Sequence, residues 1–244
     1  MEAQPLWKRF SAEFVASFIV TVSVIFPAIS LRDAGLGAFL FIMFTAALGY
    51  GLVFLLFRDV SGGHANPATT FAMMLTRQVT ILTGLFYWFA QFLGAVIAAY
   101  YAKTTFRLDT GSPEELGNLG VALPTPPYKD IQIILAEALG VAIIVFVILM
   151  VMKYADKIVA SMAVTGAVLV AIVMTAPISG GALNPAREFG PMAAAGLFKD
   201  IYVWYYLIAP FIGAAVAALL YTMFSGEAQT FRMAMPKVSI RRKS

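Results

Sequence analysis

The sequence predicts an all-α membrane protein in which six transmembrane helices and two re-entrant half-helices form an inverted 3+3 repeat. Three observations support this fold class. Hydrophobic residues make up 61% of the 244 residues and charged residues only 12%, about half the charged share of a soluble domain. Six long runs are almost free of charge, and the tripeptide Asn-Pro-Ala occurs twice, at residues 66–68 and 184–186.

Each long apolar run is long enough to cross a bilayer, because a spanning helix needs about 20 apolar residues. We expect the spans at residues 10–31, 34–57, 79–102, 130–152, 158–178 and 201–224. Lys8 and Arg9 before the first run resemble the start of a signal peptide. However, no convincing small-residue cleavage site ends that run, so the sequence favours a retained first span.

Each Asn-Pro-Ala copy predicts the start of a short helix, since asparagine is a favoured N-cap and proline a favoured first helical residue. A Gly-rich turn precedes each copy. About ten residues without a breaker follow the first copy, and a similar stretch, broken only by Gly190-Pro191, follows the second. Ten helical residues span roughly 15 Å, about half of a bilayer core. Two such half-helices predict re-entrant segments that meet near the middle of the membrane and form a pore.

The two halves of the chain repeat each other. Residues 90–99 match residues 209–218 at an offset of 119, and the Asn-Pro-Ala copies are offset by 118. Three spans in each half place the halves in opposite orientations, and sites in such folds lie at the midplane. We expect one transmembrane domain over residues 1–244. It comprises a first repeat (about 10–102), an external connector (about 103–129), a second repeat (about 130–224) and a cytoplasmic tail (about 225–244).

The basic residues indicate the orientation. With both termini in the cytoplasm, eleven of the 17 Lys and Arg residues lie on the cytoplasmic side and six on the other. We therefore attribute the net charge of +4 to basic residues that set the orientation of the protein in the membrane. No nucleic-acid partner is expected. The sequence predicts a multi-pass integral membrane protein, which we place in the cell membrane.

The sequence lacks the residues that metal sites and enzyme active sites need. The chain has no cysteine and a single histidine, which exclude a thiolate or multi-histidine metal site. No catalytic constellation is present, so we expect neither an enzyme nor a cofactor. Besides a passive channel, a proton-coupled secondary transporter and a junctional membrane protein stay open, because inverted repeats also build transporters.

The chain resembles the aquaporins, the major intrinsic protein family, over roughly residues 10–224. The matching features are the two Asn-Pro-Ala boxes in a six-span inverted repeat, together with shorter flanking motifs. These motifs are Ser-Gly-Gly-His at 61–64, Arg187 after the second box, Phe-Gly-Pro at 189–191, Ala-Gln at 90–91, Glu13 and Glu137. The resemblance implies a homotetramer in the lipid bilayer, with one pore per subunit for water and small neutral solutes.

The resemblance also implies which residues line the pore. The two boxes contribute Asn66, Pro67, Ala68, Asn184, Pro185 and Ala186. The re-entrant loops are expected to present a ladder of carbonyls from Gly62, Gly63, His64, Ala65, Gly180 and Ala182, because non-helical backbone at this depth must line a wet cavity. The two asparagine amides would donate to a passing molecule, and the helix N-termini would repel cations and protons.

Three buried ionisable residues are expected to brace the loops. The resemblance implies that Glu13 and Glu137 hydrogen-bond the two re-entrant segments and that His64 supports the first one. Intramembrane ionisable residues are often functional, so a proton relay through the glutamates and a pH gate at His64 are the alternatives.

The resemblance places a selectivity filter at Arg187, Gly181, Ile172 and one residue of the second span, either Ala46 or Tyr50. Counting from the first box without a gap favours Ala46. A filter of Ala46, Ile172, Gly181 and Arg187 would be wide and weakly polar, which favours glycerol-sized solutes, urea or boric acid in addition to water. A strictly water-selective channel is the alternative. Glu188 is similar to an acidic residue of glycerol-conducting members and is expected to face away from the pore.

Overall fold

The computed structural model describes residues 4–31, 35–106, 119–197 and 202–225, and within these residues all regular elements are helices. The eight helices are α1 (Leu6–Ser30), α2 (Leu36–Phe57), α3 (Pro67–Leu75), α4 (Ile81–Thr105), α6 (Asp130–Tyr154), α7 (Lys157–Ser179), α8 (Pro185–Ala195) and α9 (Tyr202–Phe224). Six of them are long and apolar enough to cross a membrane. Each end lies within four residues of the predicted one, and the six-span prediction is confirmed.

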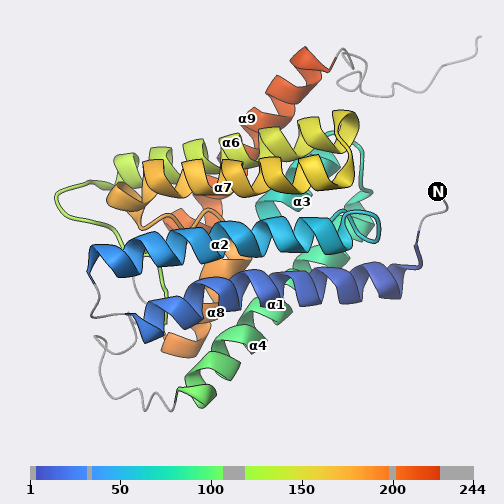
Figure 1. Cartoon of the computed structure of the whole chain (residues 1–244). Helices are drawn as coiled ribbons and strands as arrows, with labels where there is room; N and C mark the ends of the chain where they lie inside the picture. Colours follow the sequence, from blue (N-terminus) through green and yellow to red (C-terminus); the bar gives the residue numbers. More distant parts are fainter. Residues whose placement is uncertain (1–3, 32–34, 107–118, 198–201, 226–244) are drawn as a thin grey trace, which may run out of the picture.

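The helices pack as two matching sets (Figure 1). α1 packs most extensively against α4 in the first set, as α6 packs against α9 in the second, and α2 meets α7 across the two sets. The short helices cross over, since α3 packs mainly against α9 and α8 mainly against α4. Each half-helix therefore packs against the last span of the opposite repeat, as an inverted repeat requires.

Glycine allows the closest approach between spans at equivalent positions of the two repeats. A Cβ on Gly94 of α4 would lie 2.3 Å from the Phe14 carbonyl oxygen of α1. A Cβ on Gly213 of α9 would lie 2.1 Å from the Ala138 carbonyl oxygen of α6. Small residues at such contacts let the backbones of membrane helices approach closely.

The apolar residues are distributed as a lipid-facing protein requires. Large side chains such as Leu48, Leu52 and Leu56 on α2 are about half exposed, although they lie in a membrane span. The polar residues Glu13 and Glu137 are fully buried inside the bundle. The bundle therefore exposes large apolar side chains, as contact with lipid requires, and keeps these two carboxyl groups inside.

Candidate functional site

The two Asn-Pro-Ala copies begin the two short helices. Asn66 and Asn184 are extended N-cap residues, and the helices start at the prolines that follow them. The Asn66 Oδ1 accepts from the Ala68 N–H at 2.8 Å, and the Asn184 Oδ1 accepts from the Ala186 N–H at 3.0 Å. Each asparagine therefore caps its helix with the side-chain oxygen and keeps its amide nitrogen free to donate elsewhere.

Glu13 of α1 holds the loop before α3. Its Oε1 accepts from the Ser61 hydroxyl at 2.6 Å and from the His64 N–H at 3.0 Å. Its Oε2 accepts from the Ala65 N–H at 2.9 Å and from the Gln91 side-chain amide at 2.6 Å. This carboxylate replaces the water that the loop donors would otherwise need inside a membrane.

Glu137 of α6 holds the loop before α8 in the same way. Its Oε1 accepts from the Ser179 hydroxyl at 2.6 Å and from the Ala182 N–H at 3.0 Å. Its Oε2 accepts from the Leu183 N–H at 2.7 Å. The two repeats thus use equivalent carboxylates for equivalent donors.

His64 lies in a tight polar and aromatic setting. Its Nδ1 is 3.0 Å from the Thr70 hydroxyl of α3, and its ring meets the Tyr87 ring edge-on at a centroid distance of 5.3 Å. The residue is buried. These contacts tie the loop to α3 and α4.

The residue before each asparagine adopts a left-handed backbone conformation. Ala65 has φ of 48° and Leu183 has φ of 54°, which is uncommon for residues other than glycine. Their carbonyls accept hydrogen bonds from the asparagine of the other repeat. The Asn66 Nδ2 donates to the Leu183 oxygen at 2.9 Å, and the Asn184 Nδ2 donates to the Ala65 oxygen at 2.8 Å. The two loops are therefore joined by a reciprocal pair of bonds.

Tyr50 of α2 reaches this meeting point. The Asn184 Nδ2 also donates to the Tyr50 hydroxyl at 2.7 Å. A primary amide has two hydrogens, so both donors of Asn184 are used within the protein. The structure therefore differs from the expectation that this amide is open to a passing molecule, because a tyrosine takes the second hydrogen.

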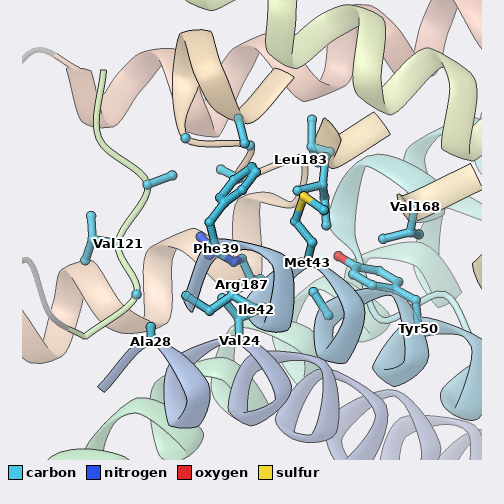
Figure 2. A pocket seen from close by; sticks show the side chains of 18 of the residues that line it. Val24, Ala28, Phe39, Ile42, Met43, Tyr50, Val121, Val168, Leu183 and Arg187 are labelled. Atoms are coloured by element: carbon cyan, nitrogen blue, oxygen red, sulfur yellow. The ribbon is translucent and has the colours of Figure 1, made fainter. Parts of the chain in front are cut away.

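A cavity of about 240 Å³ lies beside the asparagines, and we call it the Arg187 cavity. All five candidate filter residues line it: Ala46, Tyr50, Ile172, Gly181 and Arg187. Figure 2 shows Tyr50 at one end, near Val168, whereas Arg187 lies nearer Phe39 and the side of Val121. Most of the other lining side chains are apolar.

Ala46 and Tyr50 occupy different levels of the Arg187 cavity. Tyr50 contacts Asn184, so it belongs to the asparagine level. Ala46 lies one helical turn, about 5–6 Å, nearer the N-terminal end of α2. Both residues are buried and both line the cavity, at 2% and 8% exposure respectively.

A second cavity of about 400 Å³ is lined by the loop before α3, and we call it the His64 cavity. Ser61, Gly62 and His64 line it, together with residues near the N-terminus such as Gln4 and Arg9. Gly180 and Ala182 line the Arg187 cavity, whereas Gly63 and Ala65 line neither of the two. No residue lines both cavities.

Sequence reasoning missed the partner of Arg187. The Arg187 guanidinium pairs with the Glu188 carboxylate, whose other oxygen accepts from the Ala122 N–H at 2.9 Å. Both side chains are buried, and Glu188 does not line the Arg187 cavity. Consecutive helical residues do not normally face each other, so no sequence spacing signals this pair. Glu188 thus joins the arginine to the connector segment before α6.

Comparisons with known proteins agree with this architecture. The family described as major intrinsic protein matches residues 1–221. A probable aquaporin TIP2-1 of Oryza sativa subsp. japonica is 34% identical over 241 residues, covering 91% of this chain and 90% of its own length. Aquaporin TIP2-1 of Arabidopsis thaliana is 30% identical over 237 residues, covering 91% of this chain and 89% of its own length.

A solved structure has the same fold. The aquaglyceroporin from Plasmodium falciparum superposes with a TM-score of 0.79 at 21% identity, covering 92% of this chain and 98% of its own. At this identity the likeness concerns the fold alone. The family match over nearly the whole chain, the relatives at 30% identity or more and the paired Asn-Pro-Ala helices lead to one conclusion: this chain belongs to the major intrinsic protein family.

Proposed function

We propose that this protein is a passive channel that conducts water and small uncharged solutes and excludes ions and protons. The observation that carries the proposal is the meeting of two helix N-termini between two cavities, joined by the reciprocal bonds of Asn66 and Asn184. Both N-termini bring positive partial charge to the same level. A cation therefore meets an unfavourable potential there, whereas a neutral molecule does not. The relatives named as aquaporins support the same class, and no enzymatic role is proposed.

The solute range follows from the residues around Arg187. We propose that Ala46, Ile172, Gly181 and Arg187 form the filter, in which Arg187 supplies the polar contact and the other three add little bulk or polarity. Their shared lining of the Arg187 cavity supports this assignment. The small Ala46 and Gly181 leave room for a solute of glycerol size, and urea and boric acid fall within the same range. A strictly water-selective pore would need a narrower or more polar set at these positions.

The orientation proposal rests on charge and on the cavities. The His64 cavity is lined by Gln4 and Arg9, so it opens on the side of the N-terminus. The Arg187 cavity is lined by connector residues 120–123. With both termini in the cytoplasm, as the excess of basic residues favours, the filter faces the outside. We further propose a homotetramer in the cell membrane. Crosslinking in native membranes tests the assembly, and a fluorescent fusion tests the location.

Stopped-flow light scattering on proteoliposomes tests the function. Parallel runs with water, glycerol, urea and boric acid should give rates above those of protein-free vesicles, and a pH-sensitive dye inside should report no proton leak. Water flux without any solute flux would refute the wide filter and leave a water channel. Saturable uptake that depends on a proton gradient would instead refute the passive mechanism.

A further inference from the structure

We propose that Tyr50 determines the permeability of the pore at its midplane, because its hydroxyl occupies the position of a permeant oxygen at Asn184. This inference rests on the proposed channel function and deepens it. It assigns the control of flux to a residue at the asparagine level, in addition to the filter around Arg187.

The side chain of Asn184 uses all of its hydrogen-bond donors within the protein. Its Oδ1 accepts from the Ala186 and Arg187 N–H groups, at 3.0 and 3.2 Å. Its two amide hydrogens go to the Ala65 carbonyl and to the Tyr50 hydroxyl, at 2.8 and 2.7 Å. Within the described residues Asn184 thus has no amide hydrogen left for a permeant while Tyr50 stays in place.

The Tyr50 hydroxyl is chemically similar to the oxygen of a permeant molecule. A tyrosine hydroxyl is one O–H donor with two acceptor lone pairs, so it offers the same hydrogen-bonding groups as an alcohol and resembles a water molecule. It receives a hydrogen bond from the Asn184 amide, which is one of the two amides that a permeant oxygen would meet. The Tyr50 hydroxyl therefore competes with a permeant oxygen for the Asn184 amide.

Tyr50 lies at one end of the Arg187 cavity (Figure 2). Its hydroxyl accepts a hydrogen bond from Asn184, and it does not line the His64 cavity. Its side chain is only 8% exposed and belongs to the buried cluster that contains Val53, Ile144 and Val145. Packing on this scale holds the ring in one orientation. A molecule that crosses between the cavities must pass this hydroxyl or displace it.

A competing hydrogen bond slows permeation because the permeant must replace it before it binds Asn184. Tyr50→Phe removes only the hydroxyl and leaves the ring. A typical net hydrogen bond corresponds to about fivefold in rate, so we expect water flux to rise about fivefold. Tyr50→Leu also removes the ring, and it should raise glycerol flux by a larger factor than water flux.

The experiment compares wild type, Tyr50→Phe and Tyr50→Leu in proteoliposomes at equal protein density, by stopped-flow light scattering with water and with glycerol. Tyr101→Phe is the matched control, because this α4 tyrosine is 54% exposed and lines neither cavity. Its flux should equal that of wild type. Since a misfolded protein loses flux, a gain cannot come from damage to the fold.

The outcomes separate the inference from the proposed function. A rise in both Tyr50 variants, or a silent wild type that Tyr50→Phe activates, supports the inference. A wild type that conducts and variants that conduct no faster overturn the inference and leave the channel function intact. If wild type and every variant give only the rate of protein-free vesicles, although each runs as folded protein on gel filtration, both proposals are wrong.

Discussion

Replacement of Glu137 by glutamine should destabilise the protein and reduce its flux. The carboxylate accepts three hydrogen bonds, from the Ser179 hydroxyl and from the N–H groups of Ala182 and Leu183. Glutamine has nearly the same shape but only one oxygen. If that oxygen keeps the bonds to Ser179 and Ala182, the new NH₂ group faces the Leu183 N–H, a donor against a donor.

The size of the effect follows from that single mismatch. A hydrogen bond to a charged group contributes about 1.5–3 kcal/mol, and a buried N–H left without an acceptor costs about 1–3 kcal/mol. The two values overlap, because they describe the same bond from its two sides. We therefore count the bond once and expect Glu137→Gln to lower the free energy of unfolding by about 1.5–3 kcal/mol.

Unfolding in mixed micelles, followed by tryptophan fluorescence, measures the change. Ser11→Ala is the control, because the Ser11 hydroxyl donates to the Trp7 carbonyl at an exposed turn of α1. Its effect should stay within about 0.5 kcal/mol. Water flux of Glu137→Gln should also fall, since the displaced loop carries the Leu183 carbonyl that Asn66 binds. Wild-type stability together with wild-type flux would refute the bracing argument.

Three further predictions concern the filter and the packing of the spans. Ile172→His should narrow and polarise the Arg187 cavity, so glycerol flux should fall by a larger factor than water flux in stopped-flow assays; an equal fall in both would remove Ile172 from the filter. Arg187→Val is combined with Glu188→Gln so that no buried carboxylate is left unpaired. The double variant should give a partial proton leak under an imposed potential, measured with a pH-sensitive dye inside the vesicles. Vesicles that stay impermeable to protons would place Arg187 outside the proton barrier. Gly94→Ala should lower the free energy of unfolding by about 1–3 kcal/mol, because its Cβ would lie 2.3 Å from a carbonyl oxygen of α1, whereas Gly166→Ala, with no atom within 4 Å, should be tolerated.

Sequence reasoning predicted the elements well because hydropathy and capping act locally. The two short helices begin at Pro67 and Pro185, directly after the asparagines. The errors lie at charged span ends. α4 was expected to stop at residue 102 but continues to Thr105, because Lys103 donates to the Ala194 carbonyl at 3.1 Å and so finds a partner inside the protein. α1 begins at Leu6, ahead of Lys8 and Arg9.

The contacts that define the site could not be predicted from the sequence. Tyr50 and Asn184 lie 134 residues apart and in opposite repeats, so no local pattern joins them. The pairing of Arg187 with Glu188 depends on side-chain rotamers at a helix start. Periodicity indicates which face of a helix is buried, but it does not indicate which polar groups meet across the bundle. The levels that Ala46 and Tyr50 occupy depend on the position of α2 relative to Asn184, which no local pattern gives, and the filter role of Ala46 stays a proposal.

The reciprocal bonds between the loops bear on how a solute can cross the membrane. In a carrier with alternating access, one repeat rocks against the other around a central site. Here Asn66 of the first repeat donates a hydrogen bond to the Leu183 carbonyl of the second. Asn184 of the second repeat donates one to the Ala65 carbonyl of the first. Any rocking of one repeat against the other would break both bonds at once. The two bonds hold the repeats together, so a molecule can cross only by passing between them.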